Sequence, residues 1–600
     1  MALVNGAAFT TRPEIQGTFG VAASTHWLAS AVAMGVLERG GNAFDAAVAA
    51  GFTLQVAEPH LNGPGGEAPI MVCPAGSRRP RVICGQGVAP GAATIERFTD
   101  MGLDLVPGTG LLATCVPGAF DAWMLLLRDY GTISLHEALE PALHYASNGV
   151  PVLPRISDTI SSVAGLFRNC WPGSAALYLP GGKAPAKGTL LRNEAVAGTY
   201  ARILAEAESA GGARERQIEA ARACWYRGFV AEEIDRFVQS GEVLDADGQA
   251  HRGLLTGDDM ARWSASIEAP VSGSFRNYEI FKFGPWSQGP VLLQQLALLE
   301  AFPLEELDPT GPEFLHLVIE ASKLAFADRE AFYGDPDFSD VPIQHLLSED
   351  YANQRRPLIT EAASHELRPG MVANEDAWLR HLSAVNQRDA MSAVGAGEPT
   401  VGDVVAERGD TVHLDIVDRY GNMVSATPSG GWLQSSPVIP ALGFPLGTRA
   451  QMFWLEPGLP ASLEPGKRPR TTLSTSMAFR DGEPYMAWGT PGGDQQDQWS
   501  TQLFLRHVVG GKNLQEALEM PNWHSDHFPA SFWPRASRPG VVVVEGRTPP
   551  ETIEGLRARG HVVEVGPPWS EGRLSAVSRV GGNLKAASDP RSMQGYAVGR

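Results

Sequence analysis

A strand, a tight turn and a returning strand are predicted around a single threonine, and this hairpin constrains the chain more than any other stretch. Polar and apolar residues alternate from residue 411 to 416, which is the period-two pattern of a strand with one buried face. Residues 419–422 (RYGN) predict a hairpin turn, and residues 423–427 predict the returning strand. Thr411, which follows Gly409 and Asp410, is predicted to open the first of these strands.

Cleavage of the Asp410–Thr411 peptide bond would change the chemistry of this threonine. Thr411 would gain a free α-amine, whose unperturbed pKa of about 7.7–8.0 lets it accept a proton near neutral pH. Nucleophile and base would then share one residue, and no histidine would be needed. His413 is a second candidate base, but its position on the strand favours structural packing. Without cleavage, Thr411 is an ordinary strand residue, and the hairpin alone leaves both interpretations open.

The composition limits the classes of function. The chain has 600 residues, of which 44% are hydrophobic and 19% charged, as in a globular protein with a large core. The net charge of −19 argues against nucleic acid as a main partner, because phosphate binding requires clustered Lys and Arg. Five cysteines without CxxC spacing predict neither a disulfide framework nor a zinc ribbon. The sequence shows no signal-peptide pattern and no long apolar run, so we expect a cytoplasmic protein without a membrane partner.

Helices and strands are mixed along the chain. Residues 28–37 and 43–56 predict two helices, and Asn42 is expected to cap the second. A further helix is predicted over residues 498–509, after a strand and a Gly-rich turn. Residues 369–410 lack periodicity and predict an exposed, irregular segment, as a region next to a cleavage site requires.

Three other kinds of site have weaker support in the sequence. Residues 58–66 are rich in Gly and Pro, but this loop follows a helix and opens a strand, the reverse of a phosphate-binding loop; a close-packed or substrate-facing turn is expected instead. His524 and His527 lack the i, i+4 spacing of a helical metal-ligand pair. Ser287 lies in a Pro-flanked loop without the strand context of a serine nucleophile. No metal site and no cofactor are therefore predicted.

Seven stretches between residues 40 and 591 form a series with a fixed order. They are 40–49 (GGNAFDAAVA), 58–66 (EPHLNGPGG), 325–336 (AFADREAFYGDP), 411–422 (TVHLDIVDRYGN), 467–469 (KRP), 491–493 (PGG) and 588–591 (SDPR). Together they resemble the γ-glutamyltransferase (γ-glutamyl transpeptidase) family. The resemblance implies an α+β protein with the four-layer αββα fold of the N-terminal-nucleophile (Ntn) hydrolases. It also implies a precursor that cuts itself before Thr411 into a large chain, residues 1–410, and a small catalytic chain, residues 411–600, which stay together in one intertwined domain.

The resemblance assigns catalytic roles by position. Thr411 corresponds to the nucleophile, and the Asp410–Thr411 bond to the cleavage site. Gly492 and Gly493 correspond to the donors of the oxyanion hydrogen bonds. A glycine pair where a strand leads into a helix can also present backbone N–H groups to an oxyanion on general grounds. Ser429 stands where the family has a threonine hydroxyl that supports the nucleophile.

The positions expected to bind the substrate depart from the family pattern. Thr471 and Thr472 keep a hydroxyl where the family has two serines near the substrate carboxylate. Gln86 replaces the arginine that grips the glutamyl α-carboxylate, and Gly431 replaces an amine-binding asparagine. Residues 448–453 contain no carboxylate where the family has an acidic pair. Losing a charged partner at a buried site costs about 2–5 kcal/mol, so we expect the catalytic machinery to be kept and the pocket to be altered.

Two classes of function follow from these expectations. The first is a self-processing amide hydrolase or acyl transferase; a γ-glutamyl compound similar to glutathione is the favoured substrate, and an acyl amide without the free α-amino acid head is the alternative. The second is an uncut, non-catalytic relative that acts as a binding or scaffold protein. The expected partners are a small-molecule amide and the two chains of the same precursor. The oligomeric state is open, and a homodimer is one candidate.

Overall fold

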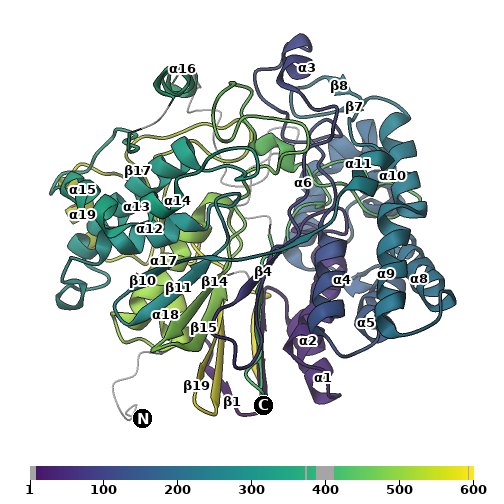
Figure 1. Ribbon diagram of the computed structural model, residues 1–600, viewed down its shortest axis with the longest axis horizontal. Coiled ribbons are helices and arrows are strands. Elements are labelled where there is room, and N and C mark those ends of the chain that lie inside the picture. Colours follow the sequence, from purple (N-terminus) through teal and green to yellow (C-terminus); the bar gives the residue numbers. More distant parts are fainter. Residues whose placement is uncertain (1–8, 372–373, 387–410, 592) are drawn as a thin grey trace.

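Two seven-stranded antiparallel sheets stand side by side at the centre of the computed structural model, which describes residues 9–371, 374–386, 411–591 and 593–600 (Figure 1). Sheet A has the order β1 (Ile15–Gly17), β20 (Asn583–Ser588), β19 (Ser575–Val580), β15 (Glu483–Gly489), β14 (Ser476–Arg480), β11 (Tyr278–Lys282) and β10 (Val271–Phe275). Sheet B has the order β21 (Tyr596–Gly599), β2 (Gly20–Ser24), β12 (Leu414–Asp418), β13 (Met423–Ala426), β3 (Ile70–Cys73), β4 (Arg81–Cys84) and β9 (Ser266–Glu268). Each sheet thus combines strands from both sides of position 411.

Three clusters of buried apolar side chains show how the layers stack. One cluster joins the inner faces of the two sheets and includes Val417 of β12 and Ala487 of β15. A second joins sheet B to helices α1 (Trp27–Glu38), α2 (Ala43–Ala57), α4 (Ala119–Tyr130), α5 (Leu135–Asn148), α8 (Glu194–Ser209), α9 (Arg214–Tyr226) and α10 (Phe229–Gln239). A third joins sheet A to helices α12 (Pro290–Leu299), α13 (Pro312–Phe332), α17 (Gln496–Val508), α18 (Leu514–Glu519) and α19 (Pro550–Ala558). The layer order is therefore αββα, which confirms the predicted α+β class and architecture.

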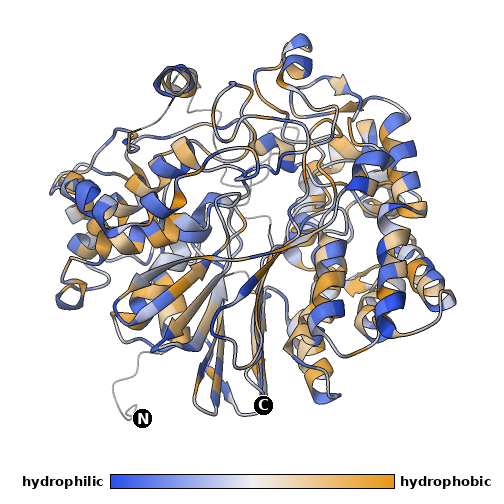
Figure 2. Cartoon of the chain, viewed as in Figure 1, coloured by the Kyte–Doolittle hydropathy of each residue, from blue (hydrophilic) through white to orange (hydrophobic). Residues whose placement is uncertain are grey.

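The outer helices have the surface pattern that this arrangement requires. In Figure 2 they carry both hydrophilic and hydrophobic segments, since one face lies on a sheet and the other meets solvent. Smaller elements surround the layers: α3 (Ile95–Asp100), α6 (Pro154–Cys170), α7 (Pro172–Tyr178), α11 (Gly257–Arg262), α14 (Ile343–Leu346), α15 (Glu349–Arg355), α16 (Glu375–Asn386), the three-stranded sheet of β16 (Trp523–Ser525), β17 (Val541–Val544) and β18 (Val562–Val565), and the strand pairs β5 (Val150–Pro151) with β6 (Leu190–Leu191) and β7 (Val243–Leu244) with β8 (Ala250–His251). Among the described helices, none combines the length and apolar character needed to cross a bilayer.

The predicted hairpin is confirmed, with one difference in burial. Strands β12 and β13 pair antiparallel in a register that joins Leu414 to Ala426. The alternation predicted one buried face, but both faces of β12 are buried because sheet B lies between a helix layer and sheet A. Leu414 and Ile416 belong to the cluster on the helix side, whereas the Asp415 carboxylate accepts a hydrogen bond from Ser575 of sheet A at 2.7 Å.

Two of the predicted helices are found, and one helix was not predicted. Asn42 caps α2 in a capping box with Asp45, as predicted. The helix expected over residues 498–509 is α17, which begins at Gln496. The expectation of an irregular segment over residues 369–410 is wrong for residues 375–386, which form α16; residues 387–410 lie outside the described part of the chain.

Candidate active site

Thr411 lies just before β12 and is almost completely buried. Its backbone forms an isolated antiparallel bridge with Ser429, and the neighbouring Val412 N–H donates to the carbonyl of Pro428 at 3.0 Å. The bridge places the two side chains together, with Thr411 Oγ1 3.1 Å from Ser429 Oγ. The two hydroxyls that the resemblance places together are therefore within hydrogen-bonding distance. Asp410, on the other side of the expected cleavage, is outside the described residues.

The glycine pair lies at the same edge of the sandwich as Thr411. Strand β15 ends at Gly489, where an added Cβ would lie 2.3 Å from the His413 ring, so the end of β15 meets the start of β12 across the two sheets. Gly492 and Gly493 follow in the turn before α17, with φ angles of 132° and 55°. This is the left-handed region that favours glycine, so the turn depends on both residues. The structure thus brings the end of β15, which leads into the proposed oxyanion turn, next to His413, two residues after the proposed nucleophile.

His413 is held by structural partners. Its Nδ1 lies 2.8 Å from Thr427 Oγ1, and its Nε2 lies 3.0 Å from both carboxylate oxygens of Asp415. Ser425 donates to the same carboxylate at 2.6 Å. The ring is completely buried between the sheets, so these contacts favour packing over a role as general base.

The Gly-rich loop at residues 58–66 packs against the segment that carries Ser429. A Cβ on Gly66 would lie 2.1 Å from the carbonyl oxygen of Ser429, and one on Gly63 would lie 2.2 Å from that of Gly431. Backbone approaches this close exclude any side chain. The loop is therefore a close-packed turn, as predicted. Gly431, which stands where the family has an amine-binding asparagine, has a φ angle of 62° and is the partner of Gly63 in this packing.

The predicted carboxylate-binding residues lie in two adjacent loops. The Ala89 N–H donates to the carbonyl of Lys467 at 2.8 Å, which aligns the loop after Gln86 with the loop before Thr471. Gln86 Oε1 and Thr472 Oγ1 are buried, and neither has a hydrogen-bond partner among the described residues. Unpaired buried polar atoms are costly, so both atoms are suited to bind a ligand.

Gln288 connects these loops to the glycine pair. Its backbone N–H donates to the Thr471 carbonyl at 2.9 Å, and its Nε2 donates to the Gly493 carbonyl at 3.2 Å. A pocket next to Gly493 is lined by Asp494, Gln495, Phe532 and Trp533, among others. The glycine turn, the threonine loop and this pocket form one connected region.

Two other stretches on which the resemblance rests contact the loops of this region. Arg329 of α13 donates to Gln288 Oε1 at 3.0 Å and forms an ion pair with Asp494, the residue after the glycine pair. Arg468 donates to Asp335 at 2.7 Å, which joins the KRP loop to the end of α13. Both arginines are buried with acidic partners, so these motifs position the loops of the site.

Two charged residues that the sequence analysis missed lie beside Ser429. Arg449 Nη2 donates to Ser429 Oγ at 2.9 Å, and Arg449 Nε donates to Glu67 Oε1 at 2.6 Å. Glu67 directly follows the Gly-rich loop, and Arg449 is part of the segment 448–453, which was notable only for having no carboxylate. An arginine within that segment was the one signal in the sequence that could have indicated this pair.

The competing sites consist of residues with structural partners. Ser287 Oγ donates to the Gly284 carbonyl at 2.9 Å, within its own turn. His524 Nδ1 lies 2.6 Å from Glu571. His527 accepts from the Gly540 N–H at 3.0 Å. None of these contacts converges on a common metal position or on a nucleophile–base pair.

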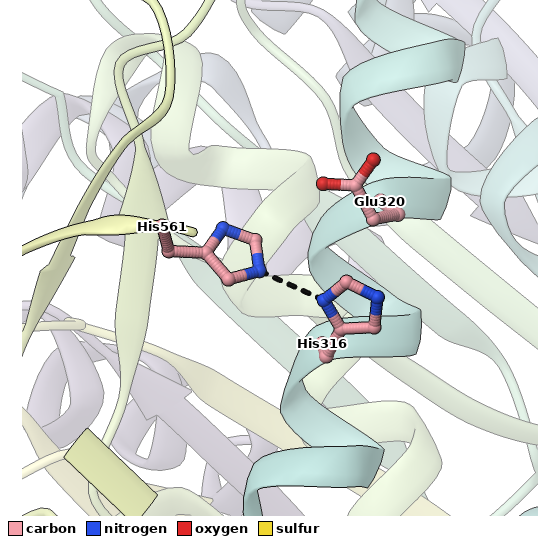
Figure 3. A group of neighbouring side chains, drawn as sticks. All are labelled: His316, Glu320 and His561. Atoms are coloured by element: carbon pink, nitrogen blue, oxygen red, sulfur yellow. Dashed lines mark hydrogen bonds between the residues drawn. The ribbon is translucent and has the colours of Figure 1, made fainter. Parts of the chain in front are cut away.

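A different group of metal-ligand type involves α13. His316 and Glu320 lie one turn apart on the helix, and the ring of His561 faces that of His316, with His316 Nδ1 2.9 Å from His561 Nε2 (Figure 3). Lys323 Nζ donates to Glu320 at 2.7 Å and lies 3.5 Å from His561 Nδ1. Burial lowers the pKa of His561 to about 2, so the ring is neutral when its two nitrogens contact His316 and Lys323. The Lys323 side chain thus supplies the cation that pairs with Glu320 in this cluster. The i, i+4 spacing of His316 and Glu320 was the sequence signal for this cluster.

Comparisons with known proteins extend over nearly the whole chain. Residues 29–599 match the family model described as Gamma-glutamyltranspeptidase. The chain is 30% identical to the glutathione hydrolase-like YwrD proenzyme of Bacillus subtilis (strain 168), over 98% of this chain and 99% of that protein. It is 31% identical to the Acylase ACY 1 proenzyme of Pseudomonas sp. (strain SE83), over 95% of this chain and 92% of that protein. A solved structure of LmbA2991 is 55% identical, with a TM-score of 0.92 over 99% of this chain and 100% of the other.

Proposed function

The chain belongs to the gamma-glutamyltranspeptidase family, and on that basis we propose that it is a self-processing N-terminal-nucleophile enzyme that cleaves small-molecule amides. The cut falls between Asp410 and Thr411 and yields a large chain, residues 1–410, and a small chain, residues 411–600. The observation that carries the proposal is the hydrogen-bonded pair Thr411 Oγ1–Ser429 Oγ, buried at the edge of the sandwich where the Gly492–Gly493 turn also lies.

The residues of this region supply each step of an acyl transfer. Thr411 Oγ forms a bond to the amide carbon while its proton passes to its own α-amine, and the carbonyl π electrons move onto oxygen. The N–H groups of Gly492 and Gly493 stabilise that oxyanion. When the carbon–nitrogen bond breaks, the α-ammonium returns a proton to the leaving amine and an ester on Thr411 remains. Water or an acceptor amine then attacks the ester and frees the threonine.

A γ-glutamyl amide similar to glutathione is the first candidate for the acyl donor. Its support is the relatives named as glutathione hydrolases and the hydroxyls kept at positions 471 and 472. The threonine hydroxyls can donate to an α-carboxylate, as serines do.

An acyl amide without the α-amino acid head is the second candidate, and the charges of the pocket favour it. Gln86 offers an uncharged amide where the family pattern has an arginine, and residues 448–453 contain no carboxylate. An α-ammonium group would find no carboxylate in that segment. A relative named as an acylase, 31% identical, fits this alternative.

Two measurements on purified protein test the proposal. On a denaturing gel, the wild type should resolve into two unequal pieces, Thr411→Ala should stay full length, and Thr411→Ser, which keeps a hydroxyl, should still be cut. Mass spectrometry of the same samples with a panel of γ-glutamyl and simple acyl amides should show products only with the cut proteins, and it ranks the two substrate classes. An uncut wild type would instead support a binding or scaffold role. Cutting or turnover by Thr411→Ala would refute the assignment of the nucleophile.

A further inference from the structure

Arg449 lies directly behind the hydroxyl that contacts the proposed nucleophile. Its side chain is 1% exposed, and its Nη2 donates to Ser429 Oγ at 2.9 Å. Ser429 Oγ in turn lies 3.1 Å from Thr411 Oγ1. The three polar groups form a continuous chain of hydrogen bonds that ends at the atom proposed to attack the substrate.

Glu67 fixes the guanidinium in this place. Arg449 Nε donates to Glu67 Oε1 at 2.6 Å, and the two side chains form a buried ion pair. The backbones of Glu67 and Ser429 exchange two hydrogen bonds, of 2.8 Å and 3.0 Å. The carboxylate that holds Arg449 and the hydroxyl that receives its hydrogen bond are therefore fixed relative to each other by neighbouring backbone.

Aromatic rings enclose the guanidinium from the sides. The carbon Cζ of Arg449 lies 5.3 Å from the centre of the Trp432 ring and 5.7 Å from that of Phe532. Phe532 is also the neighbour of Gly493, where an added Cβ would lie 2.9 Å from its ring. The Arg449 guanidinium thus lies between Ser429, which contacts the proposed nucleophile, and Phe532, which contacts Gly493. Water has little access to it there.

We propose that Arg449, held by Glu67, is a positioning residue that orients the Ser429 hydroxyl to donate to Thr411 Oγ. A guanidinium can only donate, so Ser429 Oγ accepts from Arg449, and the proposal assigns the Ser429 hydroxyl hydrogen to the 3.1 Å contact with Thr411 Oγ1. A hydroxyl that accepts from a cation is a stronger donor, because hydrogen bonds in a chain polarise one another. The donated bond stabilises the negative charge that develops on Thr411 Oγ as its proton passes to the α-amine. This inference rests on the proposed function, since it concerns the same nucleophile.

A double-mutant cycle with Ser429 tests the inference. Arg449→Met, Ser429→Ala and the double variant are compared with the wild type, and turnover is expressed per cut molecule from the band intensities on a gel. A hydrogen bond to a charged group contributes enough to lower kcat on the order of 10- to 100-fold when it is lost, with KM unchanged. The double variant should be no slower than Ser429→Ala by more than about 2-fold, because Arg449 acts through that hydroxyl. Arg449→Lys keeps the charge without the fork that reaches both partners, and should fall between wild type and Arg449→Met.

The outcomes separate this inference from the proposed function. Multiplicative losses in the double variant would overturn it, as would a change in KM with kcat unaltered, which would make Arg449 a substrate-binding residue. If thermal unfolding shows that Arg449→Met does not fold, Glu67→Gln, which weakens the anchor and keeps its shape, takes its place in the cycle with the same expectations. A wild type that is neither cut nor active overturns the proposed function and this inference together, whereas an active, Thr411-dependent enzyme with multiplicative losses overturns only this inference.

Discussion

A buried carboxyl at the end of α2 predicts how the stability of this protein depends on pH. Glu58 is completely buried, and it accepts hydrogen bonds from Thr25 Oγ1 at 2.6 Å and from the Gln594 amide. The Thr25 N–H also donates to the His413 carbonyl at 3.0 Å, so Glu58 lies next to the strand that carries Thr411. Burial raises the pKa of Glu58 from its usual 4.5 to about 7, although the hydrogen bonds act in the opposite direction. The folded protein therefore binds a proton at Glu58 more tightly than the unfolded chain does.

The sign and size of the effect follow from this difference in pKa. A shift from 4.5 to about 7, at 1.36 kcal/mol per unit, corresponds to about 3 kcal/mol of unfolding free energy. The contribution is fully present below about pH 4.5, where both states are protonated, and is lost as the pH rises through about 7. Glu58→Gln removes the titration and keeps the shape and one oxygen acceptor for Thr25.

Urea unfolding of the wild type and Glu58→Gln at several pH values measures this contribution. The free energy of unfolding of the wild type, relative to that of the variant, should fall by about 3 kcal/mol between about pH 4.5 and 8, with most of the change below about pH 7. A difference that stays constant over this range would refute the argument that burial dominates the pKa of Glu58. A difference that grows with pH would show that the hydrogen bonds dominate instead.

Two further predictions concern packing and substrate choice. An added Cβ on Gly51 of α2 would lie 2.4 Å from the Trp123 ring of α4, so Gly51→Ala should destabilise the protein by about 1–3 kcal/mol in thermal unfolding. Gly198→Ala is the matched control in α8, where nothing lies within 4 Å, and should stabilise by about 0.5–1 kcal/mol; equal effects would contradict the packing argument. Gln86→Arg should increase the turnover of γ-glutamyl amides relative to simple acyl amides if the rest of the pocket follows the family pattern. Unchanged relative rates would favour the second substrate class.

Local patterns in the sequence predicted the fold where a short stretch determines its own structure. Asn42 capped its helix as expected, and the turn at residues 419–422 closed the hairpin. The burial of both faces of β12 was not predictable from alternation, because polar residues such as Asp415 and Ser575 pair across the two sheets from 160 positions apart. The helix α16 was not predicted; its buried residues Ala377, His381 and Val385 repeat every four positions, but a polar histidine interrupts the apolar pattern.

Some residues of the candidate site were predictable from the sequence, and others were not. The threonine at the strand start and the glycine pair before α17 have recognisable surroundings in the sequence, and the structure places them at one edge of the sandwich. Glu67 and Arg449 lie 382 positions apart, and each is unremarkable within its own stretch. Only the fold, which pairs the backbone of Glu67 with that of Ser429, brings the carboxylate, the guanidinium and the hydroxyl together.

The pairing of Glu67 with Arg449 also determines the charge beside Ser429. A buried guanidinium without an acidic partner would be strongly destabilising, because desolvation removes its hydration and nothing replaces it. Glu67, which follows the Gly-rich loop, supplies a carboxylate to Arg449, whose own segment, residues 448–453, contains none. The same guanidinium donates to Ser429, the residue proposed to support the nucleophile. The proposed positioning of Ser429 thus depends on one buried ion pair, Glu67–Arg449.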